Sequence, residues 1–454
     1  MFKSGTGRHS FLVILWTLLL WAAPAFASPE LEQWNQGLVM LDEGKISASA
    51  SHFYTLFEQF PNRLDLLEGC IRVEYRRSHA DSVLINIQNR IRPKLKPGSV
   101  AYRFVEAEAL REKGQFTAAA DSFQRLASTC LSQGDPLSAL TAALKATRSR
   151  FDSKDLDQLQ SSMQEMEKLS KEVPPHPRMQ TELKVLIANT HFRLDELAKA
   201  EDMYLSVLDL SQTHQFLELQ CKASNALGSL KSKQRRHAEA CSMYEQAQAM
   251  ARELGDNPKL CMILANLGYE ETNLRKLEQA RDHLLEADAL ANSWGLHNSL
   301  GAIQSGLGAV AERGGDRVEA VGRFSKAIEL SVQSGNIFVE LGSRQRMAYN
   351  LSTMGEYSEA QVQYEICLDI INQRGGKFIL NWVLVGLAET NHKLGYLDRA
   401  WEYFRQGHAV NMEMGDKKSA ARCLVSMGLI QAQRGNYRQA LVSQHQALMQ
   451  YEDL

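Results

Sequence analysis

Small residues recur at a fixed forty-residue spacing through the C-terminal part of the chain, between large apolar positions. Seven alanines share one phase of this repeat: Ala200, Ala240, Ala280, Ala320, Ala360, Ala400 and Ala440. Five glycines share a second phase: Gly255, Gly295, Gly335, Gly375 and Gly415. A repeat of this length must bury its apolar face against its neighbours, because it cannot do so alone. The periodicity therefore predicts a solenoid, an architecture that presents extended binding surfaces.

Each repeat is expected to hold two antiparallel helices. With Ala200 as position twenty, the repeats begin at Thr181, Cys221, Cys261, Gly301, Leu341, Asn381 and Ala421. Position seven is large and apolar: Ile187, Leu227, Leu267, Leu307, Met347, Leu387 and Met427. Position eight is small: Ala188, Gly228, Gly268, Gly308, Ala348, Ala388 and Gly428. Position twenty-four is large in Tyr204, Tyr244, Leu284, Phe324, Tyr364 and Phe404, and Gln444 breaks the pattern. Small residues at positions eight and twenty let the helices approach, and the bulky residue fills the gap beneath the next repeat.

Glycines mark both turns of the repeat. Those at position fifteen are predicted to end the first helix with a left-handed cap: Gly315, Gly355, Gly395 and Gly435. Those at position thirty-five are predicted to end the second helix.

Upstream, the pattern continues with repeats of more ordinary length. One repeat starts at Glu30, with Gly37, Gly44, Phe53 and Pro61 at positions eight, fifteen, twenty-four and thirty-two. Another starts at Val100 and carries Leu110, Gly114, Phe116, Ala119 and Phe123. A poorer helical pair lies between them, and a further pair covers residues 137–173. The prolines at positions 174, 175 and 177 cannot continue a helix, so they indicate a joint between two arrays or a tight corner.

The repeat resembles the tetratricopeptide repeat (TPR) in its forty-residue form. Asn266-Leu267-Gly268 followed by Ala280, and Leu307-Gly308 followed by Ala320, carry this resemblance. It implies an all-α solenoid of stacked antiparallel helix pairs in a right-handed superhelix. The expected organisation is a leader at 1–27, irregular TPR-like hairpins at 28–177 and seven forty-residue repeats at 178–454.

The first residues indicate an export signal. Lys3 and Arg8 precede an apolar run over 11–23, and Ala25-Phe26-Ala27 fits a cleavage site before Ser28. The alternative is an uncleaved membrane anchor. Export predicts a periplasmic or secreted protein with no membrane span after cleavage.

The net charge limits the classes of partner, and the cysteine spacing indicates the state of the thiols. The chain has 51 basic and 53 acidic residues, and loss of Lys3 and Arg8 leaves 49 − 53 = −4, so no nucleic acid is expected as a partner. The 7 cysteines include no Cys-x-x-Cys pair and are predicted to be buried free thiols rather than disulfides or metal ligands.

No catalytic, cofactor or metal motif is present. Gly306-Leu307-Gly308-Ala309 resembles part of a dinucleotide fingerprint, but no strand is expected before it and its glycines have packing roles. We therefore expect no cofactor, no metal and no enzymatic activity.

The first helices of TPR pairs line a concave groove through positions two, five, six, nine, twelve and thirteen. Position thirteen reads Arg193, Lys233, Asn273, Arg313, Thr353, Lys393 and Gln433. This row suits a partner with acidic groups. The alternative is that the helix dipole favours cations at these helix ends whatever binds. Further polar groups for an extended peptide are Asn189, Asn225, Asn266, Tyr269, Gln345 and Tyr349.

A second basic stretch contains Arg72, Arg76, Arg77, Arg90, Arg92, Lys94 and Lys96. We interpret it as a solvated helical face rather than a phosphate site, because no aromatic platform accompanies it.

Two functions remain open. The favoured one is a non-catalytic scaffold that binds a protein or peptide partner in the groove. The alternative is a sensory or substrate-recruiting arm of a larger signalling or protease enzyme whose catalytic domain lies beyond Leu454. Leu448, Met449 and Tyr451 leave the last helix apolar, which indicates self-association or a further domain at that end.

Overall fold

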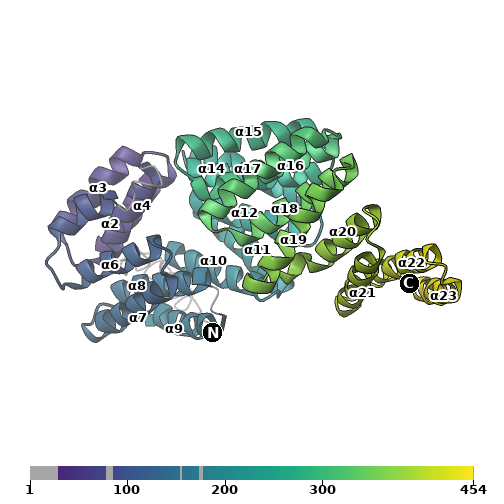
Figure 1. The fold of residues 1–454 in the computed structure, drawn as a ribbon. Coiled ribbons are helices and arrows are strands. Elements are labelled where there is room, and N and C mark those ends of the chain that lie inside the picture. The colour runs from purple at the N-terminus through teal and green to yellow at the C-terminus, as the bar shows by residue number, and fades with distance from the viewer. Residues whose placement is uncertain (1–28, 78–84, 154–155, 173–176, 453–454) are drawn as a thin grey trace, which may run out of the picture. The chain divides into compact units, whose positions relative to one another are not determined.

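The computed structural model describes residues 29–77, 85–153, 156–172 and 177–452. These residues form an all-α, TPR-like solenoid in which consecutive helices of each unit pack against one another, and they contain no strand (Figure 1). The chain divides into two compact units, unit 1 up to Ile263 and unit 2 from Leu264 to Leu454. The boundary predicted at residue 177 separates irregular hairpins from forty-residue repeats and is a different division from these two units. It stays a prediction, since residues 173–176 lie outside the described part.

The helices have nearly uniform length in the forty-residue repeats. Unit 1 contains α2 (Pro29–Asp42), α3 (Ile46–Gln59), α4 (Leu64–Arg77), the π-helical turn η1 (Ile87–Ile91), the 3₁₀ turn η2 (Arg92–Lys94), α6 (Val100–Glu112), α7 (Phe116–Ser132), α8 (Pro136–Ser153), α9 (Leu156–Glu172), α10 (Pro177–Arg193), α11 (Leu197–Thr213), α12 (Leu217–Lys233) and α13 (His237–Glu253). The unit boundary falls within α14 (Asn257–Asn273).

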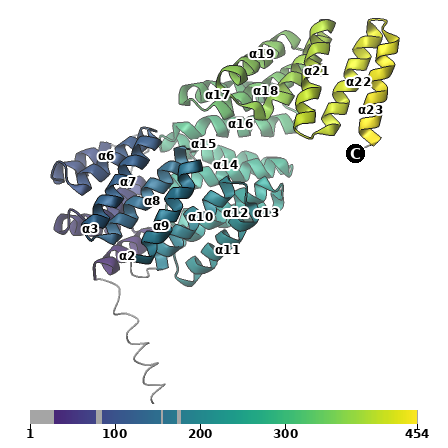
Figure 2. The same ribbon diagram turned by 90° about the horizontal axis from the view of Figure 1, so that it is seen from below.

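Unit 2 continues the same alternation of first and second helices. It contains α15 (Leu277–Ser293), α16 (His297–Gly314), α17 (Arg317–Ser334), α18 (Ile337–Met354), α19 (Tyr357–Arg374), the 3₁₀ turn η3 (Lys377–Ile379), α20 (Leu380–Lys393), α21 (Leu397–Glu413), α22 (Lys417–Gln433) and α23 (Tyr437–Glu452). Figure 2 shows α22 and α23 side by side at the C-terminal end of the chain. First helices of successive pairs also contact one another, as α16 contacts α18 and α18 contacts α20.

The predicted packing pattern is confirmed at the repeat positions. A Cβ atom added to Gly308, at position eight, would lie 2.8 Å from the ring of Phe324 at position twenty-four of the same repeat. The bulky residue also reaches the next repeat, because a Cβ atom on Gly306 would lie 2.9 Å from Leu284 of the preceding one. Both glycines lie within α16, so they serve helix packing rather than a nucleotide loop.

The predicted helix caps are confirmed as well. Gly315 and Gly335 end their helices with φ of 90° and 69°, in the left-handed region that glycine adopts without strain. Four residues with side chains hold the same conformation at the corresponding turns: Asp195, Gln215, Arg235 and Arg275. Glycine at these turns would relieve backbone strain.

Replacing Arg235 with glycine should therefore stabilise unit 1. Arg235 has φ of 61°, a conformation that costs a residue with a Cβ atom about 1 kcal/mol. We expect the midpoint of urea unfolding to rise for Arg235→Gly. The neighbouring Arg236→Gly is the control, because Arg236 has φ of −88° and no such strain to lose. An equal rise in both variants would contradict this explanation.

Unit 1 departs from the nearest-neighbour contacts expected of a solenoid. Arg72 on α4 pairs with Glu182 on α10, and Arg76 pairs with Asp256 at the start of α14 at 3.3 Å. Arg76 also donates to the carbonyl of Leu254 at 3.1 Å. The interpretation of Arg72 and Arg76 as part of a solvated face is therefore wrong. These two side chains instead fasten the N-terminal hairpins to repeats far along the chain.

The remaining cations of that stretch are more exposed, and four of them pair with carboxylates. Arg77 and Arg90 lie 3.7 Å from Glu74, Arg92 pairs with Glu106, and Lys94 pairs with Glu58. For them the interpretation as a polar surface agrees with the structure.

All cysteines are buried free thiols, as predicted: Cys70, Cys130, Cys221, Cys241, Cys261, Cys367 and Cys423. Among the described residues, no helix has the length and apolar character that a membrane crossing requires. The predicted export signal at 1–27 lies outside the described residues.

Candidate functional site: a charged pocket on the first helices of unit 1

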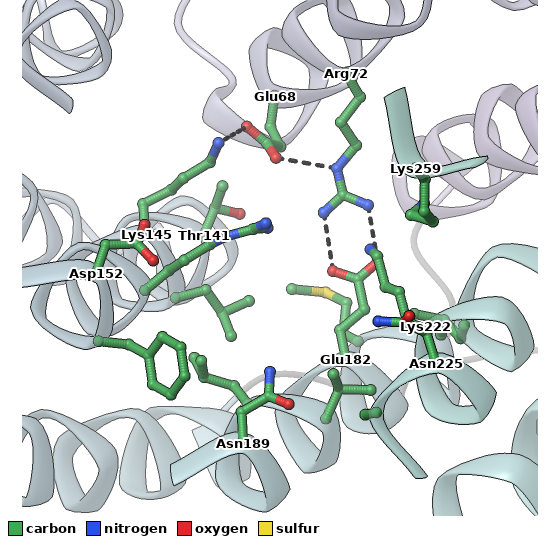
Figure 3. A pocket seen from close by; sticks show the side chains of 18 of the residues that line it. Glu68, Arg72, Thr141, Lys145, Asp152, Glu182, Asn189, Lys222, Asn225 and Lys259 are labelled. Carbon is green, nitrogen blue, oxygen red and sulfur yellow. Dashed lines mark hydrogen bonds and ion pairs between the residues drawn. The ribbon is translucent and has the colours of Figure 1, made fainter. Parts of the chain in front are cut away.

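A cavity of about 330 Å³ opens on the surface built by the first helices of unit 1 (Figure 3). Its walls come from α2, α4, α8, α10, α12 and the first turns of α14. The lining combines charged and amide groups with apolar side chains: Trp34, Glu68, Arg72, Thr141, Leu144, Lys145, Arg148, Phe151, Asp152, Met179, Glu182, Val185, Leu186, Asn189, Leu219, Lys222, Asn225, Ala226, Lys259 and Met262.

The regular repeats line this pocket through the positions expected of a TPR groove. Glu182, Lys222 and Met262 occupy position two, Val185 and Asn225 position five, Leu186 and Ala226 position six, and Asn189 position nine. The same helical face of α10 and α12 therefore supplies both its polar and its apolar wall.

Arg72 lies between two carboxylates at one side of the pocket. Its guanidinium donates to both oxygens of Glu182 at 2.8 and 2.9 Å and to Glu68 at 3.0 Å (Figure 3). Burial opposes the charge of Glu182, but Arg72, together with Lys222 and Arg178, outweighs burial and lowers the pKa of this carboxyl to about 2. Arg72 and Glu182 therefore remain an ion pair at neutral pH.

Lys145 extends this network on the other side of Glu68. Its ammonium lies 2.7 Å from Glu68 and 2.8 Å from Glu108, which is fully buried behind the pocket. Burial opposes the charge of Glu108, yet Lys145 and Arg111 together keep the pKa of this carboxyl below its usual value.

Arg178 lies behind the pocket wall and connects the helices that form it. It is completely buried, and its guanidinium contacts Asp42 at 2.6 Å, Glu218 at 3.2 Å and Glu182 at 3.6 Å. It also lies 5.3 Å from the ring centre of Phe216. This one side chain therefore joins α2, α10 and α12.

The pocket side chains carry a cationic excess. Five cations and three carboxylates line it, so the lining charge is 5 − 3 = +2. Arg148 is exposed in the pocket and has no carboxylate within 4 Å in the described part of the chain. Lys222 pairs with Glu218 at 2.6 Å, but burial still lowers the pKa of Lys222. Lys259 likewise pairs with Asp256 at 2.6 Å, so Arg148 is the pocket cation that an anionic group would compensate most directly.

Amide groups provide the remaining polarity. Asn189 accepts a hydrogen bond from the hydroxyl of Tyr204 at 2.6 Å. The Oδ1 atom of Asn225 is buried and accepts no hydrogen bond within the described residues. It is thus placed to accept one from a ligand N–H group.

The cations predicted at position thirteen do not line this pocket. Arg193 stacks on Phe151 at 4.0 Å and donates to its carbonyl, and Lys233 pairs with Asp195 at 2.7 Å. In unit 2, Arg313 donates to Asn273 at 3.1 Å. Each contact reaches back to an earlier repeat. These residues therefore link successive helix pairs, a role that neither explanation from the sequence anticipated.

The other predicted groove residues lie on first helices outside this pocket. Asn266 is partly buried, whereas Tyr269 and Lys393 are exposed. Gln345 and Tyr349 line a second pocket, in unit 2. Lys222 and Glu182 were not expected at the site, although both stand at position two, a groove position, and their charges can be read from the sequence. Arg72 and Lys145 come from the irregular repeats, where no repeat position assigns a residue to the groove.

Among the described residues, no cluster of histidine, cysteine, aspartate or glutamate has the geometry to hold a metal ion. Apart from Arg148, the cations of the pocket are paired with carboxylates around an open cavity. This arrangement suits recognition of a charged partner.

Comparison with known proteins finds likeness of fold. No family model and no curated protein matches the sequence. The apo form of RapI is 14% identical with a TM-score of 0.54, covering 69% of this chain and 97% of that one. The apo form of the quorum sensor NprR from B. thuringiensis is 12% identical with a TM-score of 0.55, covering 77% and 97%. A Rap protein complexed with Competence and Sporulation Factor is 12% identical with a TM-score of 0.51, covering 69% and 98%. At these identities the likeness concerns the TPR-like helical repeat fold.

Proposed function

We propose that this chain is a non-catalytic interaction scaffold that binds an acidic segment of a protein or peptide partner in the unit 1 pocket. The exposed Arg148, which has no carboxylate within 4 Å among the described residues, carries the proposal. Carboxylates of a partner would accept hydrogen bonds from Arg148, Lys222 and Lys259, and charge-assisted bonds of this kind are the strong ones. The Oδ1 atom of Asn225 would accept a backbone N–H of the same segment.

The apolar part of the pocket supports a peptide rather than a free anion. Phe151, Leu186 and Met262 lie among the charged groups and offer surface to side chains beside the acidic residues. A mixed lining of this kind is typical of sites that orient a ligand by a few polar contacts.

A protein of similar fold is seen in complex with another factor, the Rap protein with Competence and Sporulation Factor. NprR, also similar in fold, is a quorum sensor. By analogy of fold, recognition of a partner on the helical array is the function we extend to this chain. The identity of that partner is set by the residues of the pocket.

The proposed scaffold acts outside the cytoplasm, in the periplasm or after secretion. The basic start, apolar run and small residues at 1–27 support this location. The intact mass of the exported protein tests it: a chain beginning at Ser28 supports export with cleavage, and a retained leader contradicts it.

Binding of an acidic peptide should depend on Arg148. The test uses the full chain and a fluorescently labelled peptide with a central Asp-Glu-Asp sequence, followed by fluorescence anisotropy. Arg148→Gln should weaken binding about tenfold, the loss of roughly one charge-assisted hydrogen bond. It should leave the fold intact, because Arg148 is exposed and makes no ion pair within the described residues.

Two controls make this experiment specific. Lys326→Gln removes an exposed cation in unit 2 and should leave the affinity unchanged. A peptide with Asn-Gln-Asn in place of the acidic residues should bind more weakly to the unaltered protein. Equal affinity for the two peptides would refute the proposed acidic preference.

A further inference from the structure

Unit 2 contains a second pocket, of about 470 Å³, with a different chemistry. First helices α18, α20 and α22 supply most of its lining, and aromatic residues of second helices close its base. The lining residues are Gln345, Tyr349, Tyr364, Asn381, Trp382, Val385, Gly386, Glu389, Phe404, Asn411, Ser419, Arg422, Cys423, Val425, Ser426 and Tyr451.

Aromatic side chains form the walls of this pocket. Trp382 is 58% exposed and Tyr349 is 48% exposed, whereas Tyr364 and Phe404 are buried at its base. The faces of such rings carry partial negative charge and attract cations and planar donor groups. Exposed rings beside a cavity therefore favour a cationic or planar group over a carboxylate.

Two acceptors of the pocket have no partner within the described residues. Asn381 is 6% exposed and donates to Oδ1 of Asn411 at 3.2 Å, but its own Oδ1 atom accepts no hydrogen bond. Glu389 is exposed at the pocket surface and has no cation within 4 Å among the described residues, and partial desolvation raises the pKa of its carboxyl although Arg422 and Lys393 oppose the shift. A buried acceptor without a donor is costly, so the Oδ1 atom of Asn381 favours a ligand that supplies a donor, while the exposed carboxylate of Glu389 is accessible to a cationic group.

Comparison of the repeats shows that the Tyr364 hydroxyl is also unusual. In earlier repeats the tyrosine at position twenty-four bonds to position nine: Tyr204 to Asn189 at 2.6 Å and Tyr244 to Ser229 at 3.0 Å. Here position nine is Tyr349, and this bond is missing. Glu389 lies close enough to raise the pKa of Tyr364 further, after the larger effect of burial. Glu389, Tyr349 and Tyr364 thus form one end of the pocket.

The spacing of the two free acceptors indicates the size of the occupant. Asn381 and Glu389 stand eight residues apart on α20, which corresponds to about 12 Å along the helix axis. One side chain cannot reach both. An extended peptide advances about 3.3 Å per residue and spans this distance with roughly four residues.

We propose that the unit 2 pocket binds a short extended segment of a protein partner, with an arginine side chain against Glu389 and a backbone N–H at Asn381. The guanidinium is planar, stacks on the ring of Tyr349 and donates to the carboxylate, which suits this end of the pocket. Arg422 lies in the same pocket and opposes the incoming cation. The site is separate from the acidic-peptide pocket of unit 1 and is tested independently of it.

The test uses the full chain labelled with 5-fluorotryptophan and observed by ¹⁹F NMR, with the Trp382 signal assigned from Trp382→Phe. The probe is the blocked peptide Gly-Ser-Arg-Ser-Ala-Gly, and its counterpart carries citrulline, which has nearly the same shape without charge. We expect the arginine peptide to shift the Trp382 signal. The citrulline peptide should bind about tenfold more weakly, because it lacks the charged contact with Glu389.

Variants assign the contact to particular residues. Glu389→Gln should weaken binding of the arginine peptide to the level of the citrulline peptide, and Arg422→Gln should strengthen it. Glu413→Gln, an exposed change on α21 outside the pocket, is the matched control and should have no effect. Arg148→Gln in unit 1 should also have no effect, which separates this site from the proposed scaffold site.

Three outcomes would overturn the inference: equal binding of the two peptides, unchanged binding by Glu389→Gln, or weaker binding by Arg422→Gln. The last would show that the pocket accepts an anion through Arg422.

Discussion

Replacing Arg178 with methionine should destabilise unit 1 by about 3–5 kcal/mol, the usual cost of removing one partner from a buried ion cluster. Arg178 is completely buried and contacts carboxylates of Asp42, Glu182 and Glu218. Methionine fills similar space but leaves these carboxylates without their shared cation. The loss of stability is expected to come mainly from the uncompensated negative charge of these carboxylates rather than from lost side-chain volume.

The effect should be measured by urea unfolding, with hydrogen exchange of peptides from α2, α10 and α12 to locate it. These three helices should lose protection together, because Arg178 joins them. Arg405→Met is the matched control, since Arg405 forms a solvent-exposed pair with Glu402 at 2.7 Å and its loss should leave the unfolding midpoint unchanged.

A second variant distinguishes charge from packing. Asp42→Asn combined with Arg178→Met removes one of the uncompensated carboxylates and should recover part of the lost stability. If the double variant is no more stable than the single one, the cluster acts through packing and our electrostatic explanation is wrong.

Acid should weaken unit 1 by about 3 kcal/mol through Glu182 alone, since each pKa unit corresponds to about 1.4 kcal/mol. The pKa of Glu182 is about 2 in the folded chain, against 4.5 ordinarily. A depressed folded pKa stabilises the fold above the unfolded value. This contribution is therefore complete above pH 4.5 and is lost as the pH falls towards 2.

Urea midpoints measured between pH 6 and pH 2 test this dependence. Glu182→Gln should lower stability at neutral pH and reduce the slope below pH 4.5, because the titrating group is gone. Glu402→Gln is the control: the pKa of Glu402 is also about 2, owing to hydrogen bonds from Arg405 and Gln406, but the group lies in solvent. Solvent screening should make its effect on the slope small. Identical slopes for the unaltered chain and Glu182→Gln would contradict the assignment.

The helices, turns and helix-pair packing followed from the sequence because each depends on residues within one or two repeats. Gly308 and Phe324, at positions eight and twenty-four, meet as predicted, and Gly315 ends its helix with positive φ. The same periodicity marked the face of the first helices on which both pockets lie. Asn189, Asn225, Gln345 and Tyr349, which the sequence suggested as groove residues, lie on pocket walls, and their role in binding stays a prediction.

The charge distribution at the site was harder to predict, because position in a repeat does not determine the partner of a long side chain. Arg193 and Lys233 stand at a groove position, yet they contact the preceding repeat. Lys222 stands at position two and faces the pocket. Cations of similar reach in neighbouring positions thus take different roles, which depend on the carboxylates and carbonyls within a few ångströms.

The sequence by itself determined an array of helix pairs, their caps and their small-to-large packing contacts, since local periodicity encodes these features. Only the tertiary structure decided the charged pocket of unit 1 and the contacts that hold it. Arg72 and Glu182 are 110 residues apart in the chain, and Arg178 and Asp42 are 136 apart. They meet because the irregular N-terminal hairpins pack back onto later repeats, and no repeat register relates residues across that distance.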